Sequence, residues 1–458
     1  MTNSYFTAAD FQERRRRIFH SIGTEASVLI RGAGPVAGFE VFRQTNEFYY
    51  LTGIAVPQAY LLMDGARRRS VLYLPHGDTH ASTEGAAMSA DDEDALKQIS
   101  GVDAVYGLEQ LSGHLAHTPA AFYLPHSPAE GRLACQDTLR PAAKAVAADP
   151  WDAAPSRETA LICTLRGRRP EVVVHDLSPI LDEMRLIKSE SEIAVMRRAG
   201  ALSARSVAEA IRATRPGLYE YQLGAVADYV YQVNGAQGGG YRPIIAGGEN
   251  IWYSHYYRND CLLRSGDLVL MDYAPDVGNY TSDIGRLWPV NGRYSPVQRQ
   301  LYGFVWEYHQ ALLARIRPEA TPRQIMAEAA DVMRPAVEAM AFAKPIYREA
   351  ARRALDFQGH LSHPVGMAVH DVGRYFDRPL LPGLVFSVDL QIWIPEENLY
   401  LRVEDTVVVT ADGIEVLTAG CPSGMDAVEA LMIETGLTEQ FPMTVTMGRK
   451  VGMEETTV

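Results

Sequence analysis

The chain has 458 residues, of which 47% are hydrophobic and 22% are charged, the ordinary balance of a globular protein with room for two domains. Acidic residues outnumber basic ones by 56 to 43, and the net charge of −13 argues against a nucleic-acid-binding surface. No apolar run approaches the roughly 18–20 residues of a membrane span, and the start of the chain lacks the apolar core of a signal peptide. We therefore expect no nucleic-acid or membrane partner and a cytoplasmic location. The four cysteines, which are expected to be reduced, are Cys135, Cys163, Cys261 and Cys421.

Short apolar strands alternate with helical segments in the first third of the chain. Residues 26–30, 59–63 and 70–74 have the apolar character of strands, and residues 89–96 have the character of a helix. This alternation predicts an α/β domain, which we assign to residues 1–175. No glycine-rich loop follows a strand here, so a nucleotide-binding role is not favoured.

A second domain is predicted from residue 176 to residue 436. Ser189 and Glu192 have the spacing of a capping box, and the apolar periodicity that follows predicts a helix ending at Ala213. Further elements are expected as a helix over 219–233, strands within 240–290, helices over 295–316 and 321–340, and strands within 384–418. Residues 437–458 are expected to form a C-terminal tail that is mobile or contacts a partner.

Four acidic residues and one histidine stand out in the apolar segments of the second domain. They are Asp272, Asp283, His363, Asp389 and Glu404. A buried carboxylate is strongly unfavourable unless it is ion-paired, protonated or bound to metal. Each of these acids alone fits a salt bridge or a helix cap. Together they offer hard oxygen donors and one nitrogen, a set that suits two divalent ions such as Mn or Zn.

The spacing of the aspartates and histidines narrows the kind of site. A turn separates Asp272 from Asp283, so the two strands of a hairpin can present both carboxylates to one point. His363 and His370 lie among glycines and a proline, which predicts loops and disfavours a helical HExxH zinc site. Ser362 lies between two histidines, but no GxSxG motif supports a nucleophilic role.

Several motifs together resemble the aminopeptidase P and prolidase family, the creatinase-like "pita-bread" metallopeptidases. In the second domain they are Asp267–Tyr273, Tyr280–Arg286, Leu361–His363, Val369–Gly373 and Leu401–Asp405. Residues Arg43–Gly53 resemble the signature of aminopeptidase P N-terminal domains. The resemblance covers nearly the whole chain and implies an α/β N-terminal domain followed by an α+β pita-bread catalytic domain.

The resemblance also implies a role for each candidate residue. It makes Asp272, Asp283, His363, Asp389 and Glu404 the ligands of two divalent metal ions, with Mn expected and Zn, Co or Fe as alternatives. Asp283 and Glu404 would bridge the ions, and Asp389 or Glu404 would accept a proton. His255 and His370 would contact the scissile carbonyl and the substrate amide, although both would otherwise be interpreted as structural histidines. Tyr241 and Arg402 would line the proline-side pocket.

Two positions depart from the family pattern. Asp389 stands where the family has glutamate, the presumed proton shuttle, and the aspartate side chain is shorter by one methylene, about 1.5 Å. Gly359 stands where the family tends to have histidine, and His360 is shifted by one position. These departures affect the strength of one metal position and the expected rate of catalysis.

The resemblance implies a homo-oligomeric exopeptidase, a dimer or tetramer, that releases the N-terminal residue from peptides with proline second. A prolidase that cleaves only Xaa-Pro dipeptides is an alternative, although the N-terminal signature favours aminopeptidase P. A pita-bread protein without peptidase activity, such as a lyase, a creatinase-like hydrolase or a binding protein, is a further alternative because of Asp389.

Overall fold

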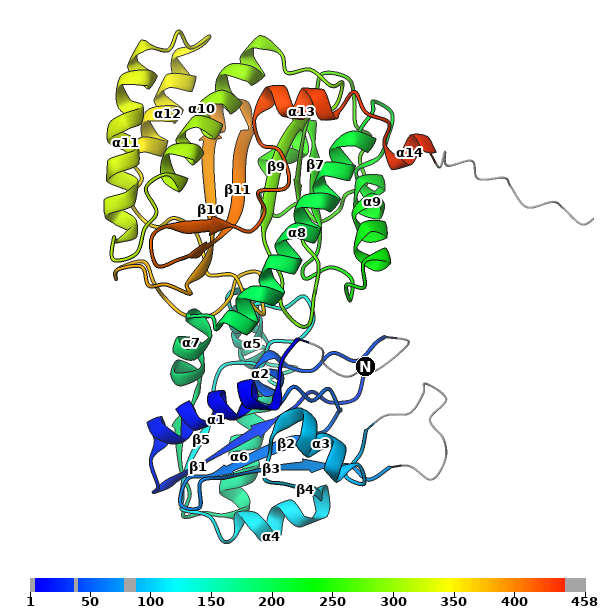
Figure 1. The fold of residues 1–458 in the computed structure, drawn as a ribbon, viewed down its shortest axis with the longest axis vertical. Coiled ribbons are helices and arrows are strands. Elements are labelled where there is room, and N and C mark those ends of the chain that lie inside the picture. The colour runs from blue at the N-terminus through cyan, green and yellow to red at the C-terminus, as the bar shows by residue number, and fades with distance from the viewer. Residues whose placement is uncertain (1–4, 37–39, 78–87, 441–458) are drawn as a thin grey trace, which may run out of the picture.

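The computed structural model describes residues 5–36, 40–77 and 88–440, which form two domains joined at a narrow waist (Figure 1). The predicted C-terminal tail, residues 437–458, lies outside the described residues from 441 onward. Its first residues form the short helix α14 (Leu437–Gln440). Among the described helices, none is both long and apolar enough to cross a bilayer.

A six-stranded mixed sheet lies at the centre of the N-terminal domain, in the order β4-β3-β2-β1-β5-β6. Its strands are β1 (Ala26–Arg31), β2 (Tyr60–Asp64), β3 (Arg69–Leu74), β4 (Ala104–Gly107), β5 (Ala121–Leu124) and β6 (Val173–Asp176). The three strands predicted from the sequence are confirmed as β1, β2 and β3. Successive residues of β1 contribute to two different apolar clusters, one on each face of the sheet. Val28 and Ile30 belong to the first cluster and Leu29 belongs to the second. Both faces are therefore covered, which explains why these strands are continuously apolar.

Helices surround this sheet and lead to the second domain. They are α1 (Ala8–Ile22), α2 (Asn46–Thr52), α3 (Glu93–Ser100), the 3-10 helix η1 (Leu108–Gln110), α4 (Leu111–Leu115), α5 (Gln136–Ala148), α6 (Arg157–Arg168) and α7 (Ser178–Leu186). The sequence pattern does not predict α5 or α6. Each of these helices buries a single residue, Gln136 or Leu165, and Pro141 interrupts α5, so the helical signal of both segments is weak.

An antiparallel sheet in the order β10-β11-β9-β8-β7 forms the centre of the second domain, and β12 pairs with β11. Its strands are β7 (Ile244–Gly247), β8 (Leu268–Asp272), β9 (Ile284–Pro289), β10 (Val385–Ile394), β11 (Leu399–Val409) and β12 (Ile414–Val416). The expected hairpin is confirmed, because β8 and β9 pair antiparallel with Asp272 opposite Gly285.

Helices pack around this sheet (Figure 1). They are α8 (Glu190–Ala213), α9 (Glu220–Val233), η2 (Gly248–Trp252), α10 (Pro296–Leu313), α11 (Pro322–Ala339), α12 (Pro345–Asp356), η3 (Pro395–Glu397) and α13 (Met425–Leu431). The capping box predicted before α8 is confirmed: the Glu192 amide donates to Ser189 Oγ, and the Ser189 amide donates to the Glu192 carboxylate. The helix ends at Ala213, as the apolar periodicity predicts.

Candidate metal centre

Four residues form one row across four neighbouring strands of the second sheet. Asp272 on β8 is opposite Gly285 on β9, Gly285 is opposite Glu404 on β11, and Glu404 is opposite Asp389 on β10. Directly opposed residues of an antiparallel sheet project from the same face, so the three carboxylates share one side of the sheet. Each of these acids is buried or nearly so. Asp272 and Glu404 are 132 positions apart in the sequence, and strand pairing brings them together.

Gly285 keeps the space between these carboxylates open. A Cβ atom at this position would lie 3.0 Å from Glu404 Cβ, 3.1 Å from Glu404 Oε2 and 3.3 Å from Arg402 Nε. Any larger side chain would therefore crowd the carboxylate of Glu404 and the guanidinium beside it. The glycine is required here by close approach of neighbouring groups rather than by backbone conformation.

Asp283 and His363 complete the cluster from outside the row. The Asp283 amide donates to Thr406 Oγ1 at 2.8 Å, and that hydroxyl donates back to the Asp283 carbonyl at 2.7 Å, which fixes the residue just before β9. His363 lies in the loop that precedes β10, and its carbonyl accepts a hydrogen bond from the Ser387 amide. His363 Nε2 lies 3.4 Å from Asp283 Oδ2.

The hydrogen bonding of His363 suits a metal ligand. Its Nδ1 lies 3.2 Å from the Pro364 carbonyl oxygen. Because a carbonyl oxygen can only accept, Nδ1 carries the proton, and Nε2, which faces Asp283, has a free lone pair. Burial, reinforced by His370, lowers the pKa of His363 to about 3, so the ring is neutral at ordinary pH. Donor atoms of Asp283, His363 and Glu404 all lie within 4.8 Å of one another, which is compact enough for one ion.

Mutual repulsion among the acids is only partly compensated by protein groups. Burial and the neighbouring Asp389 raise the pKa of Glu404 to about 8, and burial with Glu404 and Asp272 nearby raises the pKa of Asp283 well above its ordinary value. Among the described residues, no group donates a hydrogen bond to the buried oxygens Glu404 Oε2 and Asp389 Oδ1, although Glu404 Oε2 has the Arg402 guanidinium at 3.2 Å. Buried carboxylate oxygens that lack hydrogen bonds and repel one another are the donors that divalent cations satisfy. The residues present therefore fit a metal centre.

Arg402 and Tyr241 contact the carboxylates directly. The Arg402 guanidinium pairs with Asp272 and lies 3.2 Å from Glu404 Oε2 and 3.6 Å from Asp389 Oδ2. The Tyr241 hydroxyl donates to Asp272 and lies 3.0 Å from Asp283 Oδ1. Both residues thus orient the acids, and their expected place in a proline-side pocket stays a prediction.

Sequence reasoning missed several polar contacts of the cluster. Ser387 Oγ donates to Glu404, and Gln391 Nε2 donates to Asp389. Both lie two residues from Asp389 on β10, so strand alternation alone places them on the same face. That period-two pattern is the signal that could have identified them.

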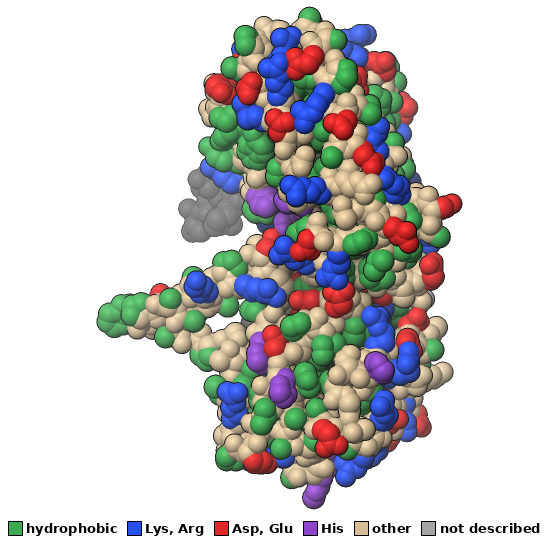
Figure 2. Space-filling view, turned by 90° about the vertical axis from the view of Figure 1, so that its left-hand side faces the viewer, with side chains coloured by type: hydrophobic (Ala, Val, Ile, Leu, Met, Phe, Trp, Pro, Cys, Tyr) green, Lys and Arg blue, Asp and Glu red, His purple; other side chains and the backbone are tan. Residues whose placement is uncertain are grey.

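Two further histidines lie beside His363. The His370 ring centroid is 4.0 Å from that of His363 and 5.9 Å from that of His255. Burial lowers the pKa of His255, whereas Nδ1 of His370 is hydrogen-bonded to the carboxylate of Asp137 on α5. Histidine side chains reach the surface at the waist, in the hollow above a slender projection (Figure 2). The three imidazoles therefore extend from the acidic cluster toward solvent.

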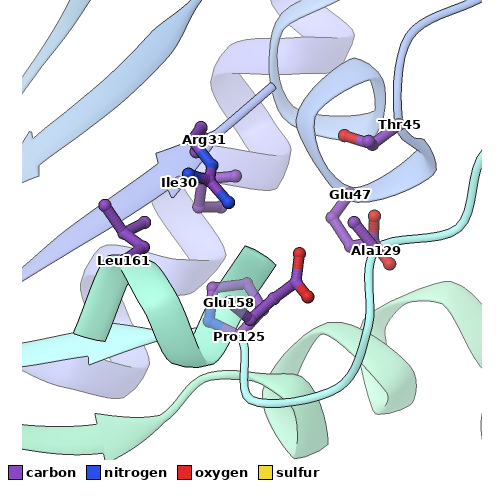
Figure 3. A pocket seen from close by; sticks show the side chains of 8 residues that line it. All are labelled: Ile30, Arg31, Thr45, Glu47, Pro125, Ala129, Glu158 and Leu161. Carbon is purple, nitrogen blue, oxygen red and sulfur yellow. The ribbon is translucent and has the colours of Figure 1, made fainter. Parts of the chain in front are cut away.

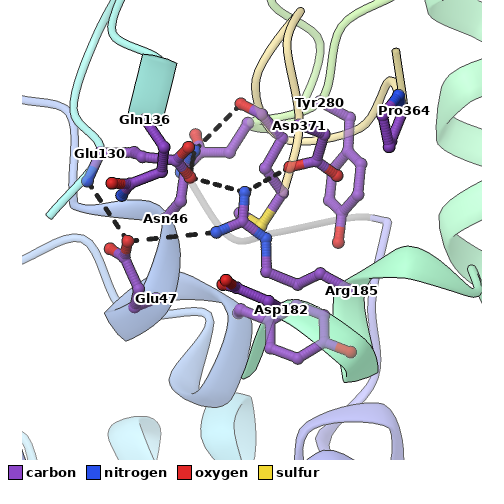
Figure 4. A network of polar contacts seen from close by, with 12 residues as sticks. Asn46, Glu47, Glu130, Gln136, Asp182, Arg185, Tyr280, Pro364 and Asp371 are labelled. Carbon is purple, nitrogen blue, oxygen red and sulfur yellow. Dashed lines mark hydrogen bonds and ion pairs between the residues drawn. The ribbon is translucent and has the colours of Figure 1, made fainter. Parts of the chain in front are cut away.

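A buried ionic network holds the His370 loop against the N-terminal domain (Figure 4). The Arg185 guanidinium on α7 pairs with Asp371 and lies 2.6 Å from Glu130 Oε2, and Lys188 Nζ lies 3.1 Å from Asp371 Oδ2. Asn46 from the N-terminal signature donates to Glu130 and to the Met367 carbonyl, just before His370 in the chain. Asn46 and Glu130 of the N-terminal domain thus act with Arg185 and Lys188 to hold the loop that carries His370.

Comparison with known proteins gives a family for both halves of the chain. Residues 194–411 match the model of metallopeptidase family M24, and residues 11–121 match that of the aminopeptidase P N-terminal domain. The Xaa-Pro aminopeptidase of Escherichia coli K12 is 30% identical over 94% of this chain and 99% of its own length. The chain belongs to the aminopeptidase P family. The predicted recognition is confirmed, and membership makes the protein a hydrolase of the metallopeptidase class.

Solved structures agree with this assignment. Escherichia coli aminopeptidase P with the inhibitor Pro-Leu is 28% identical, and its zinc-substituted form in complex with product is 29% identical. Each has a TM-score of 0.76 and covers 93% of this chain and 98% of its own. The predicted fold, an α/β N-terminal domain followed by a pita-bread catalytic domain, is confirmed.

The second departure from the family pattern has a structural account. The His360 ring packs against the rings of Phe357 and Phe376, with both centroid distances 5.3 Å. Its contacts are therefore aromatic, whereas those of His363 are with the acidic cluster. His360 does not replace a histidine at the position of Gly359 by a shift of one residue.

Two other polar features of this aminopeptidase P family member lie apart from the cluster. Glu220, Asp260 and Cys261 are close together, but the Glu220 carboxylate already accepts from the amides of Gly247 and Cys261 and from two side chains. A small pocket in the N-terminal domain includes Glu47 and Glu158 in its lining and none of the acidic cluster (Figure 3). The hydrogen bonds of Glu220 are those of a structural carboxylate.

Proposed function

We propose that this protein is an Xaa-Pro aminopeptidase, a metal-dependent exopeptidase that releases the N-terminal residue from peptides with proline at the second position. The observation that carries the proposal is the row of Asp272, Glu404 and Asp389 around Gly285, with Asp283 and His363 beside it. An X–Pro bond has no amide hydrogen and a fixed proline φ, so a site shaped to the ring can select it.

Two divalent ions, most simply Mn with Zn, Co or Fe as alternatives, would be held by Asp272, Asp283, His363, Asp389 and Glu404. Asp283 and Glu404, which face the other ligands, would bridge the two ions. Such ions supply a nucleophilic water at neutral pH and polarise the scissile carbonyl. The neutral His363, the opposed acids and the two carboxylate oxygens that accept no hydrogen bond from the described residues support this assignment.

The remaining chemistry belongs to side chains of this protein. Asp389 or Glu404 would accept the proton that the attacking water loses, because both are buried carboxylates within the cluster. His255 and His370 contact the substrate amide and the carbonyl oxygen as it gains negative charge. Tyr241 and Arg402 bind the acids from the side and face the proline ring.

Substrate length separates this function from that of a prolidase. Purified, metal-loaded protein should release the first residue from an Xaa-Pro peptide of four or five residues at a higher kcat/KM than from the matching dipeptide. A peptide with alanine in place of proline is the control. Cleavage of the dipeptide alone would identify a prolidase. If none of the three substrates is cleaved, the protein would be interpreted as a pita-bread protein without peptidase activity.

The proposal includes domain limits, location and assembly. We assign residues 1–175 to the N-terminal domain, 176–436 to the catalytic domain and 437–458 to a tail. Cys135, Cys163, Cys261 and Cys421 are free thiols, which fits the cytoplasm. A homo-oligomer, dimer or tetramer, is expected and can be tested by light scattering.

A further inference from the structure

Helix α5 belongs to neither of the two matched family regions but reaches the catalytic site. The matched regions end at residue 121 and begin again at 194, and α5 spans Gln136–Ala148 between them. Gln136 is its only buried residue, and α5 lies at the waist, the level at which Figure 2 shows a slender projection. The helix is therefore an exposed arm that is anchored near its start, where Gln136 is buried and Arg140 donates to Ser127 Oγ at 2.8 Å.

The anchor of this arm is apolar and lies at the catalytic domain. Cys135, the residue before α5, is buried in a small cluster with Tyr241, Ala274, Ala368 and Val369. Tyr241 contacts two acids of the candidate metal centre, and Val369 immediately precedes His370. The start of α5 is thus packed against the loop that carries His370, so the position of Asp137 is set by buried contacts.

Asp137 lies in the first turn of α5 and its carboxylate is hydrogen-bonded to His370 Nδ1. A carboxylate can only accept, so the Nδ1 atom donates and carries the proton. This leaves Nε2 as the imidazole nitrogen available to other partners, and the contact holds the ring in one orientation. Asp371, the next residue, is fixed by Arg185 and Lys188, so His370 is held from both sides.

We propose that Asp137 is a positioning residue of the catalytic site: it fixes the tautomer and orientation of His370, so that Nε2 faces the substrate. This rests on the role given to His370 in the proposed function. Asp137 acts through His370 and does not touch the reacting atoms. The site of this chain then includes a carboxylate from the α5 arm, in addition to the residues of the catalytic domain.

The test compares Asp137→Asn with Asp152→Asn in metal-loaded protein. Asp152 is exposed and lies four residues beyond the end of α5, so its variant removes the same charge without touching the contact with His370. We expect Asp137→Asn to keep its metal and to lose about 10- to 100-fold in kcat on an Xaa-Pro peptide with little change in KM. Asp152→Asn should match the parent protein. Equal behaviour of the two variants, or a change in KM alone, would overturn the proposal.

A double variant separates positioning from a general structural effect. If Asp137 acts through His370, then Asp137→Asn combined with His370→Ala should be no slower than His370→Ala alone. If the two losses multiply, Asp137 acts independently of His370 and the proposal is wrong. Asp137→Glu keeps a carboxylate, which can only accept, whereas asparagine can also donate from its NH2 group, so Asp137→Glu should retain more activity than Asp137→Asn.

A readout without catalysis keeps this proposal distinct from the proposed function. In nitrogen-15 NMR of labelled histidine, the His370 signals, assigned by their loss in His370→Ala, should show a protonated Nδ1 that Asp137→Asn perturbs and Asp152→Asn does not. This result in a protein that cleaves no Xaa-Pro peptide would refute the proposed function and leave the positioning intact. An Nδ1 signal unaffected by Asp137→Asn would refute the positioning itself.

Discussion

Asp389 on β10 and Glu404 on β11 lie directly opposite each other in an unbroken antiparallel ladder that runs from Val385 to Ile394. Two buried carboxylates in this relationship repel each other, and this is one reason why the pKa of Glu404 rises to about 8. The pair therefore favours a bound cation, and Asp389 is also the position at which the resemblance to the family predicts a glutamate.

Removing either bridging acid should abolish metal binding. Asp283→Asn and Glu404→Gln each take one charged ligand from both ion positions, so we expect the metal content measured by plasma mass spectrometry to fall from two ions per chain toward zero. Glu415→Gln on β12 is the control, because Glu415 pairs with Arg197 on α8 and is not among the candidate ligands. Full metal content in both bridge variants would refute the dinuclear centre.

His363 and His370 are seven residues apart but should have different effects on replacement. His363→Ala removes a ligand and should lower metal content. His370→Ala should keep the metal and reduce kcat by about 10²–10⁴-fold, the range for a lost acid–base or carbonyl contact. Metal content and steady-state rates measured on the same preparations decide this. Normal metal content in both variants would remove His363 from the ligand set.

Lengthening Asp389 should improve the site. The regular pairing of Asp389 with Glu404 shows that no bulge moves the backbone to compensate for the shorter side chain, and Asp389 Oδ1 is left without a hydrogen bond. Asp389→Glu is therefore expected to bind the second ion more tightly and to raise kcat on an Xaa-Pro peptide.

The alanine variant at the same position is the control for this prediction. Asp389→Ala should lower activity by about 10²-fold or more, because it removes a ligand and a proton acceptor. A slower Asp389→Glu would mean that the site is already filled by the shorter side chain. Unchanged Xaa-Pro cleavage in Asp389→Ala would exclude Asp389 from both roles.

Glu47 should make stability depend on pH. Burial, and then the nearby Glu130 carboxylate, raise the pKa of Glu47 from 4.5 to about 8 in the folded protein. The folded state thus holds this proton more tightly than the unfolded state. The resulting stabilisation is complete below the unfolded pKa and is lost as pH rises through about 8.

Glu47→Gln imitates the protonated carboxyl and should reduce the loss of unfolding free energy between about pH 5 and about pH 8.5. Urea denaturation of the metal-loaded protein at both pH values measures this. Glu93→Gln, at an exposed position of α3, should leave the pH dependence unchanged. An undiminished pH dependence in Glu47→Gln would show that other groups cause it.

Local sequence patterns were enough to predict much of this protein. Continuous apolar runs predict β1 to β3 because both faces of their sheet are covered, and the capping box at Ser189 predicts the start of α8. The five candidate ligands can be identified because charged residues in apolar strands are costly without a partner. These features depend on short segments of chain, so the sequence determines them directly.

The tertiary structure decides the contacts between segments that lie far apart in the chain. Strand register places Gly285 between Asp272 and Glu404, and no local pattern encodes which strands pair. Asp137 and His370 are 233 positions apart, and no local pattern indicates that the start of α5 reaches the loop of His370. The sequence by itself therefore determined which residues are candidate metal ligands, because a charged residue in an apolar strand is costly without a partner. Folding decided how those residues are held, because orientation depends on partners brought in from distant segments.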